Sequence, residues 1–212
     1  MKTPISYYGG KQNLVSELLK LIPEHTQYVE PFCGSASLFW EKQKVANEVI
    51  NDFDLRVANF WEVLQTNFEP LQQIIKTTLH HENNHSEAKR ILKEEMKDPI
   101  EYAWAFWVQT VMSFSFKIFG GFAFSFEREE SKTIRIKREQ FTRAFYDRIK
   151  DVCIFNRDAL DLIVIKDNPE TFMYFDPPYP ESNCGHYERG KNVYYDLLAL
   201  LPSLKCKWLL YS

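Results

Sequence analysis

Apolar residues along much of the chain fall into short runs separated by polar turns, a pattern typical of alternating strands and helices. The pattern predicts a strand at residues 25–32, a tight turn at 33–35, a helix at 36–44, a second strand at 45–50 and a helix at 55–79. The alternation returns later, with helices at 139–149, 159–163 and 193–201 and strands at 152–156, 171–175 and 207–211. This order of elements predicts an α/β domain.

The pattern changes between residues 80 and 137. A polar, histidine-rich stretch at 80–85 precedes a helix that carries Trp104, Phe106 and Trp107, and a further aromatic run surrounds Gly120 and Gly121. We interpret residues 63–137 as an insertion into a main domain that consists of residues 1–62 and 138–212.

The turn after the first predicted strand leaves room for a ligand. Gly34 and its small neighbours stand where a strand end meets a helix start, so a ligand can approach the backbone there. Such a turn is, by itself, more typical of a plain structural joint. Asp52 favours the ligand-binding interpretation of this turn, because a carboxylate at the end of the second strand is placed to hold the two hydroxyl groups of a ribose. The pair predicts a nucleoside-binding site.

A second candidate site follows the strand predicted at 171–175. The tetrapeptide Asp176-Pro177-Pro178-Tyr179 combines a carboxylate, two rigid prolines and an aromatic ring. It lies at the carboxyl end of the strand, which is the end at which open α/β sheets bind ligands. The carboxylate and the proline carbonyls can accept both protons of a planar amino group, and the tyrosine offers a stacking face. Such acceptors draw the nitrogen toward tetrahedral geometry, which makes its lone pair available for methyl transfer from a sulfonium. The alternative is a strand-ending turn with a carboxylate cap.

Charge limits where a nucleic acid could bind. The formal charge of -3 and the pI near 6.0 give no overall basic surface, so any DNA contact requires a local patch. Basic residues dominate the stretch 131–150, for which a solvated helix face is the simpler alternative. The candidate phosphate contacts in this stretch are Lys132, Arg135, Lys137 and Arg138.

Other patterns argue against competing functions. The four cysteines form no Cys-x-x-Cys pair, which is unlike a zinc site or a disulfide framework, and Lys11 lies outside the spacing of a phosphate loop. His80, His81 and His85 are more typical of a polar helix end than of a metal site, so no metal is expected. No signal peptide or membrane span is recognisable, which predicts a cytoplasmic protein without membrane contact.

Aromatic residues in the insertion allow two interpretations. Trp104, Phe106, Trp107, Phe114 and Phe116 could stack on bases, but their spacing is more typical of a hydrophobic core. We therefore predict that these side chains belong to the core.

Four anchors occur in the order typical of one enzyme family. They are Tyr7-Tyr8-Gly9-Gly10-Lys11, Glu30-Pro31-Phe32-Cys33-Gly34-Ser35, Asn51-Asp52 and Asp176-Pro177-Pro178-Tyr179. With these anchors the chain resembles the Dam-type family of N6-adenine DNA methyltransferases over nearly its full length. The resemblance implies a Rossmann-like sheet that binds S-adenosylmethionine, with residues 63–137 as a mostly helical target-recognition domain. An aspartate at position 176, where relatives that methylate cytosine have serine, implies adenine as the target base.

The resemblance also implies roles for individual residues. Cofactor contacts are implied for Tyr7, Lys11, Phe32, Gly34, Asp52, Asp158 and Asp176, with Asp52 on the ribose and Asp158 near the adenine ring. Asp176, Pro177, Pro178 and Tyr179 would hold an adenine flipped out of duplex DNA. Implied partners are double-stranded DNA and a cognate restriction endonuclease, in a bacterial or phage-encoded protein.

The sequence departs from the family pattern at two places, and these change what is expected of the target sequence and of the sheet. Residues 113–123 differ from the stretch shared by relatives that read GATC-like sites, so the target sequence is not predicted. The family pattern also implies a helix and a terminal strand pair after the strand at 207–211, so these C-terminal strands are expected to be missing. A sheet edge exposed in this way would favour self-association. The alternatives are a shortened cofactor- or DNA-binding remnant that serves as a partner subunit, and an amino methyltransferase acting on RNA or protein.

Overall fold

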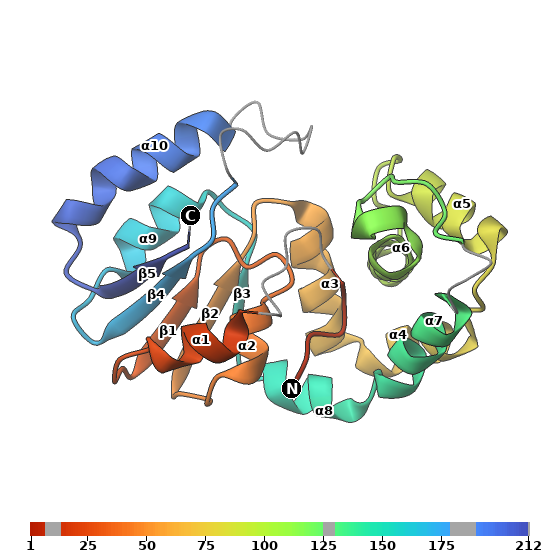
Figure 1. Ribbon diagram of the computed structural model, residues 1–212, viewed down its shortest axis with the longest axis horizontal. Helices are drawn as coiled ribbons and strands as arrows, with labels where there is room; N and C mark the ends of the chain where they lie inside the picture. Colours follow the sequence, from red (N-terminus) through yellow and green to blue (C-terminus); the bar gives the residue numbers. More distant parts are fainter. Residues whose placement is uncertain (7–13, 125–129, 179–189, 212) are drawn as a thin grey trace. The chain divides into compact units, whose positions relative to one another are not determined.

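The computed structural model describes residues 1–6, 14–124, 130–178 and 190–211, without the side chains of 130–133 and 190–192. The chain forms two compact units (Figure 1). The sheet unit consists of Gln12–Phe53 and Val152–Ser212, and the helical unit consists of Met1–Lys11 and Asp54–Asp151.

The sheet unit contains a five-stranded sheet in which every described pairing is parallel. The strand order is β3-β2-β1-β4-β5. The strands are β1 (Gln27–Glu30), β2 (Asn47–Asn51), β3 (Cys153–Phe155), β4 (Thr171–Phe175) and β5 (Lys207–Leu210). Its helices are α1 (Val15–Lys20), α2 (Ser37–Glu41), α9 (Ala159–Lys166) and α10 (Gly190–Leu200), the last followed by the short η2 (Leu201–Ser203). The predicted α/β fold class is confirmed.

Successive strand residues point to opposite faces, and each face has its own core. Val29, Val49 and Met173 lie in register on one face and pack with apolar residues of α9, α10 and η2. On the other face, the rings of Tyr28 and Phe172 lie 6.0 Å apart, and Tyr28 is fully buried. The strand β4 is buried along its whole length, as expected for a strand covered on both faces.

The strand order places β1 at a change of direction. From β1 the chain moves to β2 on one side, and later enters β4 on the other side of β1. Because all five strands run parallel, the segments that follow β1, β2, β3 and β4 lie at the same edge of the sheet. Open α/β sheets bind their ligands at such a switch point, outside the carboxyl ends of the strands.

The helical unit is built around α6 (Pro99–Met112), which packs against α3, α4, α5 and α7. The other helices are α3 (Leu55–Thr66), α4 (Phe68–Thr77), α5 (Glu82–Ile91), α7 (Glu130–Gln140) and α8 (Arg143–Ile149), with the short η1 (Phe114–Phe116) after α6. Phe106 and Trp107 of α6 are fully buried, which confirms them as core residues. Phe114 and Phe116 are exposed, so their assignment to the core was wrong.

Helix boundaries within this unit differ from the predictions at two points. The helix predicted at 55–79 is interrupted at Asn67, whose φ of -131° and ψ of 41° are not helical. The polar stretch at 80–85 begins a helix, α5, because the His81 side chain accepts the Asn83 N–H at 3.1 Å and so caps its N-terminus. His80 and His81 thus lie at a helix end, as expected, whereas His85 lies within α5 and is buried. The unit also extends beyond residues 63–137, since α3 and α8 belong to it.

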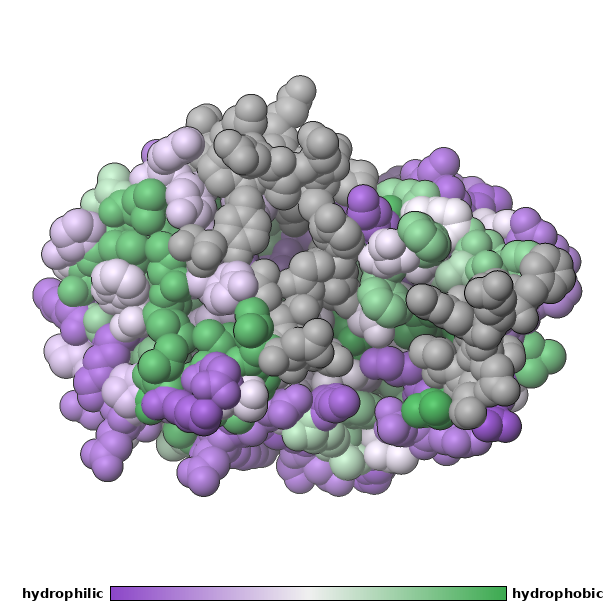
Figure 2. Space-filling model, in the orientation of Figure 1, coloured by the Kyte–Doolittle hydropathy of each residue, from purple (hydrophilic) through white to green (hydrophobic). Residues whose placement is uncertain are grey.

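The surface of the sheet unit is partly apolar. Figure 2 shows green, apolar surface on the visible face of this unit, where Figure 1 draws α1 and the strands. Leu14 and Leu21, which flank α1, are among its exposed apolar residues. Across the described ranges, no helix has the length and hydropathy that crossing a membrane requires.

Candidate active site

The turn after β1 is fixed to the end of β2 by two backbone N–H groups. The Cys33 N–H donates to the Asn51 carbonyl at 2.9 Å, and the Gly34 N–H donates to the Asp52 Oδ2 at 2.8 Å. Gly34 has a φ of 45°, in the left-handed region that glycine adopts without strain. The two residues predicted as parts of one nucleoside site are therefore in direct contact.

Asn51, the last residue of β2, connects two of the loops at this edge of the sheet. Its side-chain amide donates to the Pro31 carbonyl at 2.8 Å and to the Arg157 carbonyl at 3.1 Å, and its side-chain oxygen accepts the Arg157 N–H at 3.1 Å. The side chain is fully buried. One amide group thus satisfies backbone groups from the loop after β1 and the loop after β3, and holds both loops against β2.

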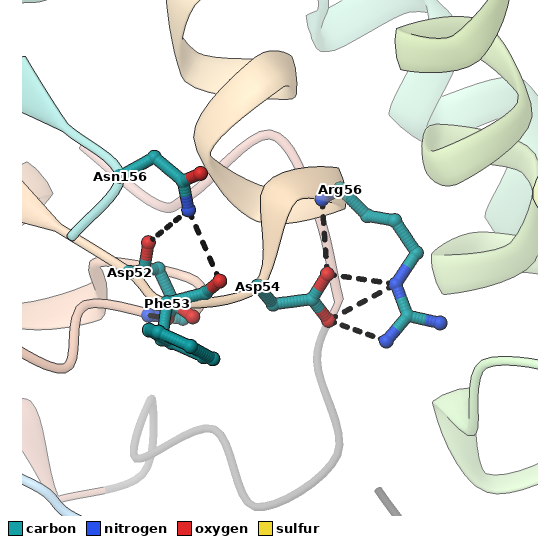
Figure 3. A network of polar contacts seen from close by, with 6 residues as sticks. Asp52, Phe53, Asp54, Arg56 and Asn156 are labelled. Carbon is teal, nitrogen blue, oxygen red and sulfur yellow. Dashed lines mark hydrogen bonds and ion pairs between the residues drawn. The ribbon is translucent and has the colours of Figure 1, made fainter. Parts of the chain in front are cut away.

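A second amide fixes the loop after β2. Figure 3 shows the Asn156 side chain pointing at the chain segment that contains Asp52 and Phe53. It donates to the Asp52 carbonyl at 2.8 Å and to the Phe53 carbonyl at 3.0 Å. These bonds fix the backbone of Asp52 and thereby the position from which its carboxylate extends.

The next segment of the chain begins the helical unit. The Asp54 carboxylate accepts the Arg56 N–H at 2.9 Å and caps α3, and the Arg56 guanidinium binds the same carboxylate through two of its nitrogens (Figure 3). Asp54 therefore has a structural role at the start of a helix, whereas Asp52, two residues earlier, contacts the turn after β1.

Glu30 is a buried carboxylate at the end of β1, only 1% exposed. Its Oε1 accepts the Phe39 N–H of α2 at 2.8 Å, and the Tyr28 hydroxyl donates to the same oxygen. Burial raises the pKa of Glu30 to about 7, and the negative charge of Asp176 adds to this effect. The hydrogen bonds from Tyr28 and Phe39 and the charge of Lys42 oppose it, so burial dominates.

Asp176 follows β4 directly, at the same edge of the sheet as the turn after β1. Its side chain is half-buried and Pro177 is buried, and the negative charge of Asp176 contributes to the raised pKa of Glu30. The carbonyl of Phe175 accepts the Tyr211 N–H at 2.9 Å, which fixes the backbone before Asp176. Two acidic groups, Asp52 and Asp176, therefore flank the turn at the switch point of the sheet.

Sequence comparison agrees with this arrangement. The model of the D12 class N6 adenine-specific DNA methyltransferase family matches residues 7–200. The chain belongs to this family. It is also 33% identical over 93 residues to a protein named Type II methyltransferase M1.LlaDCHI from Lactococcus lactis subsp. cremoris. That match covers 42% of the chain and 31% of the relative, so the chain corresponds to about a third of the relative's length. Membership of the D12 class confirms the resemblance to N6-adenine DNA methyltransferases.

Other residues implied by the D12-class resemblance have varied surroundings. Phe32 is partly buried and packs against the core that contains Val29. Asp158 caps α9, since its Oδ1 accepts the Leu160 N–H at 2.8 Å. Tyr7, Lys11 and Tyr179 lie outside the described residues.

The candidate phosphate contacts differ in their exposure. Arg135 is exposed and lies 4.0 Å from Glu139, whereas Arg138 donates to the Thr78 carbonyl at 2.8 Å. Lys137 donates to the Thr3 carbonyl at 3.4 Å, and burial together with the charge of Lys2 lowers its pKa to about 8. Lys132 lies in α7, but its side chain is not described.

Sequence reasoning assigned no separate role to Asn51, Asn156 or Glu30. The first two act through bonds to backbone carbonyls of distant segments, and no spacing in the sequence indicates such bonds. Glu30 and Asn51 were visible as parts of family anchors, but their burial became evident only in the structure. No group of three metal-ligating side chains occurs among the residues that the structure describes.

Proposed function

We propose that this chain is a site-specific DNA methyltransferase that transfers a methyl group from S-adenosylmethionine to N6 of an adenine flipped out of duplex DNA. The observation that carries the proposal is the bond between Gly34 and Asp52 at the switch point of the sheet, with Asp176 after the neighbouring strand β4. Family membership points to the same reaction.

The residues at this edge suit the chemistry of S-adenosylmethionine, which carries a net positive charge and two ribose hydroxyl donors. Asp52 is an acceptor for the ribose hydroxyls, and accepting one backbone N–H does not exhaust the capacity of a carboxylate. Gly34 has no side chain, so a ligand can approach its backbone closely. Phe32 and Asp158 complete the proposed pocket, and Tyr7 and Lys11 are proposed from the family motif.

In the proposed mechanism, Asp176 and the carbonyls of Pro177 and Pro178 accept the N–H groups of the flipped adenine. S-adenosylmethionine, when bound, supplies an electrophilic methyl group on sulfur. The acceptors would raise the electron density at N6 and orient its lone pair toward this methyl group, and the proton that N6 loses on methylation would pass to the Asp176 carboxylate or to solvent. Tyr179 is proposed to stack on the flipped base, which offsets part of the cost of unstacking.

We propose the helical unit, including the predicted insertion 63–137, as the part that reads the DNA. Its loop 113–124 carries exposed aromatic side chains, with Phe114 72% and Phe124 64% exposed. The backbone of this loop is held by bonds from Phe114 N–H to the Gly121 carbonyl and from Ala123 N–H to the Met112 carbonyl, at 2.8 and 2.7 Å. Exposed rings on a fixed loop favour base stacking. Among the proposed phosphate contacts whose side chains are described, Arg135 is the exposed one.

Two interactions with other proteins also remain proposals. A cognate restriction endonuclease would act beside the enzyme in the cytoplasm. Self-association could use β5, which lies at one edge of the sheet and exposes 42% of Trp208. Light scattering of the purified chain over a concentration series measures this association, and a constant monomer mass would contradict it.

A transfer assay tests the central proposal. The purified chain is incubated with mixed-sequence DNA and labelled S-adenosylmethionine, and modified adenines are then located by sequencing. We expect N6-methyladenine at one recognition site, and loss of transfer in Asp176→Ala, with cofactor binding weakened but still measurable in calorimetry. Cofactor binding without transfer would indicate a binding subunit, and transfer to RNA or protein alone would indicate another substrate class. Either result would contradict the proposal.

A further inference from the structure

Glu30 lies in a cluster of buried charged and polar groups on the face of the sheet that carries α2. The Tyr28 hydroxyl donates to Glu30, and the Lys42 Nζ lies 4.1 Å from the centroid of the Tyr28 ring. Lys42 in turn forms an ion pair of 2.5 Å with Glu48, and both of these side chains are 2% exposed. The direct ion-pair partner of Lys42 is therefore Glu48, while Glu30 accepts hydrogen bonds from Tyr28 and from the backbone.

The two hydrogen bonds to Glu30 connect the strand to the helix across the turn. Glu30 is the last residue of β1, and Phe39 lies in the first turn of α2, so one carboxyl group spans the intervening segment 31–38. This segment contains Phe32 and Gly34, both proposed to contact the cofactor. A change in the charge of Glu30 therefore acts at the base of the proposed cofactor turn.

We propose that Glu30 is a positioning residue for this turn and that binding of S-adenosylmethionine expels a proton from its carboxyl group. The inference rests on the proposed function. A positive ligand beside Asp176 and the turn stabilises the ionised form of every nearby carboxyl group. Glu30 responds because it is the buried group that holds a proton near neutral pH, where burial raises its pKa to about 7.

Charged and titratable groups of this cluster come from β1, β2, β4 and the segments after α2 and β4. They are Tyr28 on β1, Lys42 after α2, Glu48 on β2, Tyr174 on β4 and Asp176 after β4. Tyr28 has a pKa raised well above its ordinary value by burial, so it stays protonated at neutral pH and remains a donor to Glu30. Glu30 therefore changes its protonation state near neutral pH, whereas Tyr28 does not.

Calorimetry in buffers with different ionisation enthalpies measures the proton release. At pH 7 we expect up to about half a proton to be released per S-adenosylmethionine bound, because a group with a pKa of about 7 is then half protonated. S-adenosylhomocysteine lacks the sulfonium charge and should release less. Glu30→Gln should abolish the release, whereas Glu170→Gln, which removes an exposed carboxyl group of the same unit, should preserve it.

The outcomes separate this inference from the proposed function. If the wild-type chain binds S-adenosylmethionine without releasing protons, or if Glu30→Gln releases as many protons as wild type, the inference is wrong and the proposed function stands. If Asp176→Asn alone abolishes the release, the proton comes from Asp176 and the inference is also wrong. If the wild-type chain does not bind the cofactor, the proposed function fails first.

A measurement on the wild-type chain avoids dependence on the folding of a variant. Carboxyl-carbon NMR of the glutamate-labelled protein follows the titration of Glu30 directly. We expect its midpoint to move to lower pH when S-adenosylmethionine is added, by more than with S-adenosylhomocysteine. An unchanged midpoint would overturn the inference.

Discussion

The Gly34 N–H and the Asp52 carboxylate are joined by a hydrogen bond of 2.8 Å between the turn after β1 and the end of β2. The carboxylate proposed to hold the ribose thus also fixes the backbone that the cofactor would approach. Asn156 in turn holds the Asp52 carbonyl at 2.8 Å. Substitutions of Asp52 should consequently affect the backbone conformation of the turn as well as the negative charge beside it.

We predict that Asp52→Ala weakens S-adenosylmethionine binding by about 10- to 100-fold, the equivalent of losing one hydrogen bond to a charged group. Asp52→Asn retains an oxygen that can accept the Gly34 N–H but removes the charge. It should therefore bind the cofactor more weakly than wild type while unfolding at nearly the same temperature. Titration calorimetry and thermal unfolding measure the two effects, and unchanged affinity in Asp52→Ala would contradict the proposed ribose contact.

Asn51 should be more important for stability than its lack of charge suggests. Replacing it by alanine leaves the carbonyls of Pro31 and Arg157 and the Arg157 N–H without their buried partner. Each of these three groups costs about 1–3 kcal/mol, so we expect the free energy of unfolding to fall by at least about 3 kcal/mol in urea titrations.

Asn47→Ala is the matched control, because Asn47 is an exposed residue of the same strand. Its unfolding midpoint should stay near that of wild type. Equal midpoints for the variants at positions 47 and 51 would show that the side chain of Asn51 does not hold the loops together.

The contrast between these two asparagines shows what the sequence could and could not predict. Hydrophobic runs located all five strands, because a buried strand such as β4 is apolar at every position after Thr171. The helix α5 was missed because its buried residues are only His85, Ala88 and Ile91, a stripe too narrow to stand out in a polar segment. Motifs identified Gly34 and Asp52, but the roles of Asn51 and Glu30 depend on contacts with residues that burial and chain topology bring together.

Local geometry also limited the prediction for the aromatic residues. Phe106 and Phe114 belong to the same aromatic-rich stretch, yet the first is fully buried and the second is 72% exposed. The difference arises because α6 ends at Met112 and Ser113 is extended, with ψ of 145°, so the chain leaves the helix path before Phe114. Ser115 and Phe116 then adopt positive φ angles of 54° and 57°. Left-handed conformations of residues other than glycine are uncommon and cannot be inferred from spacing.

This difference predicts opposite effects for two alanine substitutions. Phe114→Ala should leave stability nearly unchanged but lower DNA affinity several-fold, because base stacking on an aromatic ring contributes about 1–3 kcal/mol. Phe106→Ala should lower the free energy of unfolding by about 3–5 kcal/mol, since it leaves a cavity in the core. Fluorescence anisotropy with duplex DNA and urea unfolding measure both quantities, and unchanged DNA affinity in Phe114→Ala would exclude stacking by this ring.

Substitutions of the basic residues of α7 should affect either DNA binding or stability, depending on the residue. Arg135→Ala should weaken DNA binding and reduce the slope of log affinity against log salt by about 1, as expected for one lost phosphate contact. Arg138→Ala should instead destabilise the helical unit by about 1–3 kcal/mol, because Arg138 donates to the Thr78 carbonyl at 2.8 Å. An unchanged salt slope in Arg135→Ala would remove Arg135 from the proposed DNA contacts.

The raised pKa of Glu30 predicts a specific dependence of stability on pH. The pKa of this group is about 7 in the folded chain and about 4.5 when unfolded, so the folded state binds more protons between these values. Its contribution to stability is complete below about pH 4.5 and is lost as the pH rises to about 7. The loss is on the order of 1 kcal/mol per pH unit.

Glu30→Gln cannot ionise but can still accept the Phe39 N–H, so the variant lacks this dependence on pH. The difference in unfolding free energy, wild type minus variant, should therefore fall steadily between pH 5 and pH 7. Taking the difference cancels the titration of groups common to both proteins, and Glu170→Gln should give a difference that is flat over the same range. A difference that is constant or rises for Glu30→Gln would mean that Glu30 is already ionised in the folded chain. The folded protein loses stability with rising pH only when a carboxyl group binds its proton more tightly in the folded state than in the unfolded state.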